Sequence, residues 1–215
     1  MSWSQNAWRA IEPIFAAITQ HPFIRELSLG TLDREKFLFF MNQDALYLED
    51  FGKVLAGVAI KCQVKSDVDS LLGFASEHIK AEMVLHKLYL ADQNLSAERS
   101  PSCLLYTSFL YRQLSVAAGE TAFASTIPCF WIYQKVGDYL LSLPKTPHNP
   151  YQSWIDLYGG EEFAQGVRTA LGIIDRFAAE TTEAIRAEML KVFILASKME
   201  WLFWDSAYKL EKWAI

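Results

Sequence analysis

The side chain with the clearest chemical potential is Cys129, which directly follows Pro128 in the aromatic stretch TIPCFWIYQKVGDYL. A cysteine thiolate is a strong nucleophile, so this residue could attack a substrate. Cysteine is also among the most buried residue types and often acts as a small core hydrophobe. Pro128 removes a backbone hydrogen bond and is expected to kink the helix beside Cys129, which would help to expose the sulfur. The stretch alone leaves both roles open.

Two carboxylates occupy positions that helical spacing turns toward the interior. The first stripe, at i, i+4 and i+7, consists of Phe40, Asp44, Tyr47, Phe51 and Leu55. The second consists of Phe193, Ala196, Glu200, Phe203 and Ala207. A buried carboxylate is costly unless it is hydrogen-bonded, ion-paired or kept for chemistry. The alternative to catalysis is that each acid ties down a helix through a tyrosine hydroxyl or a backbone amide, and spacing alone does not decide between them.

Phenols surround these groups in the predicted arrangement. Tyr133 lies one turn after Cys129 and shares a helical face with it and with Ser125, while Tyr106 in LLYTSFLY is another candidate inward phenol. A cavity with a thiol, two carboxylates and several tyrosines would suit a flat aromatic ligand with a polar edge. Rings would stack on it, and the acids would bind amino groups or ring nitrogens.

A possible metal site is predicted to fail on geometry. His78, Glu82 and His86 form an i, i+4, i+8 row. The two histidines are about 12 Å apart along the axis at the usual helical rise, so they cannot share one ion. The chain also contains no Glu-x-x-His spacing of the kind that carboxylate-bridged diiron bundles use. We therefore expect no metal and no other cofactor, with Glu82 paired to one of the histidines.

Composition narrows the function classes. A net charge of -5 and a pI near 5.4, with scattered basic residues, argue against a nucleic-acid partner. No apolar run reaches the roughly 18 to 20 residues that span a bilayer, and the N-terminus does not look like a signal peptide, so no membrane partner is expected. Three widely spaced cysteines, Cys62, Cys103 and Cys129, favour a reducing, cytoplasmic location. Cys62 and Cys103 are interpreted as core residues.

Apolar residues recur at three and four throughout, which predicts an all-α fold: a single-domain helical bundle over residues 1–215. Asp33 is a plausible N-cap, and HPF at 21–23 is read as the break that ends the first helix. The expected helices are 4–19, 33–63, 67–91, 101–118, 121–142, 150–158, 160–179 and 182–212.

Six ordered stretches together resemble the TenA family, the thiaminase II or aminopyrimidine aminohydrolase group. They are HPFIRELSLGTLDREKFLFFMNQDALYLEDF, EHIKAEMVLH, YTSFLYRQL, IPCFWIYQKVG, YQSWIDLYGGEEF and MEWLFWDSAYKLEKW. The resemblance implies a haem-oxygenase-like helical bundle without haem. It also implies hydrolysis at the methylene carbon attached to an aminopyrimidine ring, which releases hydroxymethylpyrimidine for thiamin salvage, and a homotetramer.

The resemblance also implies roles for individual residues. Cys129 matches the family's active-site cysteine, Asp44 the acid that holds the aminopyrimidine edge, and Glu200 the acid proposed to shuttle protons near the leaving group. The lining of the substrate pocket is matched by Tyr47, Tyr106, Tyr133, Tyr158 and Phe203. Departures from the family pattern occur at Phe109, Phe130 and Ser206. They leave the natural substrate open among thiamin, aminomethylpyrimidine and a formylated amine.

Two other function classes stay open at this point. One is a non-catalytic protein that binds a pyrimidine for regulation, and the other is an oxidase or oxygenase on the same fold, which would contain iron or consume oxygen. The richness in aromatic residues also suggests that some of them form contacts between subunits, with Trp3, Trp8 and Trp213 as candidate surface residues.

Overall fold

The computed structural model describes the backbone of residues 1–90 and 96–215, and the side chains of these residues except 77–88. Over the described residues the fold is all-α, as predicted, and contains no strand. The helices are α1 (Trp3–Thr19), α2 (Pro22–Leu29), α3 (Arg34–Lys61), α4 (Lys65–Leu90), α5 (Pro101–Val116), α6 (Gly119–Ser142), α7 (Gln152–Tyr158), α8 (Glu161–Glu180) and α9 (Glu183–Lys209).

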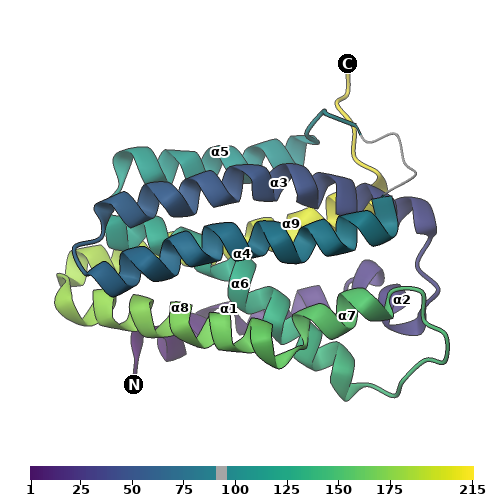
Figure 1. Ribbon diagram of the computed structural model, residues 1–215, viewed down its shortest axis with the longest axis horizontal. Helices are drawn as coiled ribbons and strands as arrows, with labels where there is room; N and C mark the ends of the chain where they lie inside the picture. The colour runs from purple at the N-terminus through teal and green to yellow at the C-terminus, as the bar shows by residue number, and fades with distance from the viewer. Residues whose placement is uncertain (91–95) are drawn as a thin grey trace.

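The long helices form a bundle in which α6 and α9 are the central pair. In Figure 1, α5, α3, α4 and α8 follow one another across the near side, with α6 and α9 behind them. Both central helices contact α1, α3 and α5, and α6 also packs against α7 and α8. The middle of α6 is therefore almost continuously buried, from Thr121 to Gly137, with Cys129 and Lys135 as half-buried exceptions.

The short helix α2 is a correction to the sequence prediction, in which HPF only ended the first helix. His21 caps α2 because its Nδ1 accepts a hydrogen bond from the Phe23 backbone N–H at 3.2 Å. Pro22 then occupies the first turn, where its missing N–H costs nothing. Gly30 ends the helix in the left-handed conformation at φ 68°. The proline therefore starts a helix at the point where another one ends.

The remaining helix boundaries agree with the predicted ones to within three residues. The predicted N-cap is confirmed, since the Asp33 carboxylate accepts a hydrogen bond from the Glu35 N–H at 2.7 Å. The largest difference is at α9, which ends at Lys209 because Leu210 adopts a left-handed conformation with φ 52°. The following residues turn onto the start of α5, where Glu211 accepts a hydrogen bond from the Ser102 N–H at 2.8 Å.

Helix α6 runs through Pro128 without interruption. Two hydroxyls just before the proline bond back to the preceding turn: Ser125 donates to the Ala122 carbonyl and Thr126 to the Phe123 carbonyl. Pro128 and Phe130 are buried, whereas Cys129 between them is half-buried. Cys129 is therefore less buried than its two neighbours, although it still packs against the apolar core.

Of the other two cysteines, Cys103 lies in the core, as predicted, whereas Cys62 only packs against it. Cys103 is fully buried and its thiol donates to the Gln43 carbonyl, while Cys62 is half-buried and packs against the same apolar cluster. Of the three candidate surface tryptophans, Trp213 is 44% exposed. Trp3 and Trp8 are instead half-buried, because Trp3 packs on Phe193 and Trp8 against Phe15 and Trp131.

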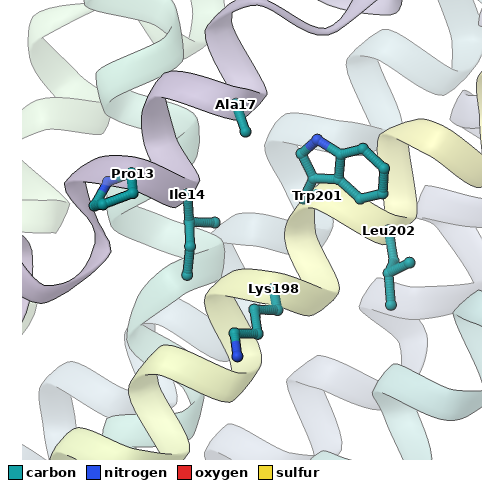
Figure 2. A pocket seen from close by; sticks show the side chains of 6 residues that line it. All are labelled: Pro13, Ile14, Ala17, Lys198, Trp201 and Leu202. Atoms are coloured by element: carbon teal, nitrogen blue, oxygen red, sulfur yellow. The ribbon is translucent and has the colours of Figure 1, made fainter.

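A shallow apolar groove runs between α1 and α9 on the molecular surface. Figure 2 shows its six lining side chains projecting from the two helices: Pro13, Ile14, Ala17, Lys198, Trp201 and Leu202. None of the predicted site residues lines this groove. No helix among the described residues combines the length and the apolar character that crossing a bilayer requires.

Candidate functional site

Helix α3 brings Asp44 and Tyr47 into the interior. The whole predicted stripe is buried, and Asp44 itself is 4% exposed. Its Oδ2 has no hydrogen-bond partner among the described residues. The Tyr106 hydroxyl lies close enough to the Tyr47 hydroxyl to help raise the pKa of Tyr47, which burial raises most. The two hydroxyls do not form a well-aligned hydrogen bond. Both groups on α3 thus present polar atoms that a ligand would satisfy.

Helix α9 brings Glu200 into the same interior, where it is 2% exposed. The Tyr106 hydroxyl on α5 donates a hydrogen bond of 2.7 Å to Glu200 Oε1. This contact is of the kind expected if Glu200 only holds two helices together and takes no part in catalysis. It accounts for Glu200 only in part, and it leaves Asp44 unexplained, because no comparable bond reaches Asp44 Oδ2.

Burial dominates the acid–base behaviour of both carboxyls. Loss of hydration raises the pKa of Asp44 to about 7. The same cause raises the pKa of Glu200 to about 8, with a further increase from the negative charge of Asp44 that the Tyr106 hydrogen bond opposes. Near neutral pH each group can therefore either donate or accept a proton.

Cys129 lies among the tyrosines contributed by three helices. Burial is the main cause that raises the pKa values of Tyr47 on α3, Tyr106 on α5 and Tyr133 on α6, and a thiolate at Cys129 would raise all three further through charge repulsion. The pKa of Tyr133 is raised first by burial and then by the charges of Glu200 and Asp44. These interactions connect the thiol and both acids through Tyr133, while the functional roles predicted for them stay predictions.

Aromatic rings form the walls of this cluster. The Tyr47 ring lies 4.9 Å from Tyr106 and 5.7 Å from Phe203, centroid to centroid. On the other side, Tyr133 lies 5.0 Å from Tyr158, which α7 contributes. All five residues that were expected to line the pocket are buried, and the structure brings them together around the thiol and the acids.

Two wall residues were missed by the sequence reasoning. Trp204 lies 5.0 Å from the Tyr133 ring, and Trp154 lies 4.6 Å from the Tyr158 ring. Both are fully buried, and their indole N–H groups have no hydrogen-bond partner among the described residues. The available signal was the spacing of Trp154 one turn before Tyr158, and the position of Trp204 directly after Phe203.

The histidine row of α4 lies outside the residues that can be assessed. His78, Glu82 and His86 fall within 77–88, whose side chains are not described. Among the side chains that are described, no group of three or more His, Cys, Asp or Glu is placed to hold a metal ion.

Comparison with known proteins gives a consistent picture over the whole chain. A family model described as the TENA/THI-4/PQQC family matches residues 8–210. An aminopyrimidine aminohydrolase from Bacillus subtilis (strain 168) is 35% identical, with 100% of this chain and 93% of the relative covered.

Solved structures agree on the fold. A TenA homologue from P. horikoshii OT3 superposes with a TM-score of 0.87 at 25% identity, covering 97% of this chain and 99% of its own. A domain with a heme oxygenase-like fold from Shewanella denitrificans OS217 has a TM-score of 0.73 at 14% identity, covering 98% and 93% of the two chains. The all-α, haem-oxygenase-like bundle is therefore confirmed.

The raised carboxyl pKa values predict that stability falls as the pH rises. A group whose pKa in the fold lies above its unfolded value stabilises the fold fully below the unfolded pKa, and this contribution is lost as the pH rises through the folded pKa. For Glu200 this window runs from 4.5 to about 8. Glu200→Gln keeps an oxygen that accepts the Tyr106 hydrogen bond but cannot ionise.

We therefore expect Glu200→Gln to gain stability relative to the wild type between pH 5.5 and pH 9. The gain should be on the order of a few kcal/mol, because one pKa unit corresponds to about 1.4 kcal/mol. Urea unfolding at both pH values measures it, with Glu162→Gln, on an exposed face of α8, as the matched control. A difference between Glu200→Gln and the wild type that stays constant with pH would contradict the assignment.

Proposed function

The chain belongs to the TENA/THI-4/PQQC family, and from this premise we propose that it is a hydrolase of thiamin-related aminopyrimidines, an aminopyrimidine aminohydrolase or thiaminase II. The observation that carries the proposal is the grouping of the buried Asp44 and Glu200 with the half-buried Cys129 among aromatic rings. The similarity to the Bacillus subtilis aminopyrimidine aminohydrolase over the whole chain supports it.

Asp44 binds the edge of the aminopyrimidine in this proposal. Its unpartnered Oδ2 accepts a hydrogen bond from the exocyclic amine or from a protonated ring nitrogen. A charge-assisted hydrogen bond of this kind is stronger than a neutral one. The rings of Tyr47, Tyr133 and Phe203 provide apolar surfaces against which the flat ring stacks.

Cys129 is the proposed nucleophile. Direct displacement at the methylene carbon is slow, so the thiolate first forms a bond to a carbon of the pyrimidine ring. Electrons from the ring then break the bond between the methylene carbon and the leaving amine or thiazole. Water adds to the methylene carbon, the carbon–sulfur bond breaks, and hydroxymethylpyrimidine is released with the thiolate restored.

Glu200 is the proposed proton carrier. An ordinary cysteine thiol is mostly protonated at neutral pH, so a neighbouring base must take its proton. With a pKa of about 8, Glu200 is ionised in a fraction of molecules near neutrality, and in that form it accepts the proton with the help of the Tyr106 hydroxyl. The protonated carboxyl then protonates the leaving amine, which suits a group whose pKa lies near the working pH.

Several broader features complete the proposal. Residues 1–215 act as a single TenA/thiaminase II-like domain that needs no metal or other cofactor. The protein acts in the cytoplasm on small molecules of thiamin metabolism, without a nucleic-acid or membrane partner. All three cysteines are thiols in the structure, which suits a reducing compartment.

Turnover of a defined pyrimidine tests the reaction and the role of Cys129 together. The purified wild type is expected to hydrolyse at least one of thiamin, aminomethylpyrimidine and its formylated form to hydroxymethylpyrimidine. Cys129→Ser should fold normally and lose several orders of magnitude in turnover, because a hydroxyl without a dedicated base is a far weaker nucleophile. Melting temperature, product affinity and turnover are measured on one preparation.

A well-folded Cys129→Ser protein with near-normal turnover would return Cys129 to the role of a core residue. Pyrimidine binding without any turnover by the wild type would favour the binding-protein class. Oxygen consumption or bound iron would favour the oxygenase class.

The role of Asp44 predicts a different profile. Asp44→Asn removes the negative charge that holds a protonated ring nitrogen, while the thiol and Glu200 remain. We expect a loss of about 2 to 4 kcal/mol in affinity for hydroxymethylpyrimidine, the usual effect of breaking a buried charged hydrogen bond. Titration calorimetry measures it, with Cys129→Ser as the comparison that should keep its affinity. Wild-type product affinity in Asp44→Asn would refute the assignment.

We propose that the protein assembles as a homotetramer, which the family resemblance implies. The exposed Trp213 and the apolar groove between α1 and α9, with a volume of about 410 Å³, are surfaces that contact with a second copy would cover. Sedimentation equilibrium at micromolar concentration is expected to give four times the mass of one chain. A monomer under those conditions would contradict this assembly.

A further inference from the structure

Two segments of the backbone come into contact where α6 crosses the end of α7. A Cβ added at Gly137 on α6 would lie 2.4 Å from both the Gly159 nitrogen and the Tyr158 carbonyl carbon, and 2.6 Å from the Tyr158 oxygen. Real Cβ atoms essentially never come this close to other heavy atoms, and backbone atoms cannot move aside as a flexible side chain can. The absence of a side chain at Gly137 therefore sets how closely the α7–α8 junction approaches α6.

The residue held by this contact is Tyr158, one of the proposed pocket walls. Its ring packs 5.0 Å from Tyr133, which lies one turn before Gly137 on the same helix. It also packs 4.6 Å from Trp154 and 5.1 Å from Phe163, so it contacts rings on both sides of the junction. Tyr158 therefore contacts α6 at two places one helical turn apart: its ring packs against Tyr133, and its backbone lies against Gly137.

We propose that Gly137 is a positioning residue that sets the place of the Tyr158 ring in the pyrimidine pocket and thereby the affinity for substrate. This inference rests on the proposed function for the identity of the ligand. Gly137 touches none of the reacting groups and acts only through the junction. Gly137 shares the 24-residue helix α6 with Cys129, about two turns away, while Asp44 and Glu200 are carried by α3 and α9, so the 7-residue helix α7 is the element we expect to shift.

Gly159 lies on the other side of the same contact and can be substituted independently of Gly137. A Cβ added at Gly159 would lie 2.3 Å from Leu141 Cδ1 and 2.9 Å from its Cγ, both in a side chain that is 41% exposed. Truncating Leu141 would remove these two overlaps. The 3.2 Å approach to the Gly137 oxygen would remain, and it requires a shift of only a few tenths of an ångström.

The first test compares Gly137→Ala with Gly172→Ala, whose added Cβ meets nothing within 4 Å on the exposed face of α8. For Gly137→Ala we expect KM and the product dissociation constant to rise about tenfold or more while kcat changes little, the signature of lost uniform binding. Near-UV circular dichroism should also change, because Tyr158 packs on Trp154. Gly172→Ala should match the wild type in all of these measurements.

The second test keeps the inference falsifiable if Gly137→Ala fails to fold. Gly159→Ala should raise KM and alter the near-UV spectrum by less than Gly137→Ala does, because the Leu141 side chain can rotate and relieve part of the overlap, and the double variant Gly159→Ala/Leu141→Ala should move both back toward the wild-type values. Leu141→Ala alone should resemble the wild type. Product affinity and KM that stay at the wild-type level in Gly159→Ala, or a defect that Leu141→Ala does not relieve, would overturn the inference. So would a loss confined to kcat.

Failure of the proposed function gives a different result. A wild-type protein that neither binds nor hydrolyses an aminopyrimidine would refute that function. The near-UV spectra of Gly159→Ala and of its Leu141→Ala double variant would still report whether the junction positions the Tyr158 ring. Altered spectra with recovery in the double variant would support the positioning role, and unchanged spectra would overturn it.

Discussion

The burial of Asp44 and Glu200 in an aromatic interior is the constraint on which the rest of the structure depends. Water is a far better environment for a carboxylate than a wall of rings, so the fold favours the protonated forms of both acids. The hydrogen bond from the Tyr106 hydroxyl replaces one of the hydrogen bonds that Glu200 would make to water. Asp44 Oδ2 receives no hydrogen bond from the described residues. Packing elsewhere, for example between α3 and α4 and between α6 and α9, must offset this cost.

The same desolvation connects stability to chemistry. An exposed glutamate would be fully ionised near neutral pH and a poor donor to a leaving amine, whereas a buried one with a pKa of about 8 holds a proton that it can give up. Asp44 Oδ2, which has no partner among the described residues, is likewise costly to the fold by itself and suited to binding a ligand. The features that weaken the fold are thus the ones that the proposed hydrolysis requires.

Helical periodicity was sufficient to predict the long helices and both inward acids, because an i, i+4 stripe fixes which face of a helix is buried. It could not predict α2, since His-Pro is equally consistent with the end of one helix and the start of the next. Trp3 and Trp8 illustrate a second limit. Composition indicates that the chain has more aromatic residues than one core holds, but it does not show which of them are exposed. Trp3 and Trp8 are half-buried because they pack on Phe193 and Trp131. Trp154 and Trp204 were missed because a buried position does not identify which rings it packs against.

The site residues differ in how they are held. The thiol, the acids and three of the tyrosines lie on helices of at least 16 residues whose faces pack along their length, so their relative positions are determined by many contacts. Tyr158 lies on the 7-residue helix α7 and depends on the contact between that helix and Gly137. On our proposal, substitutions at this junction would move Tyr158 more than the proposed reacting groups. In the proposed site, Tyr158 is therefore the lining residue that can shift most independently of the proposed reacting groups, because the other lining residues share their helices or are carried by long ones.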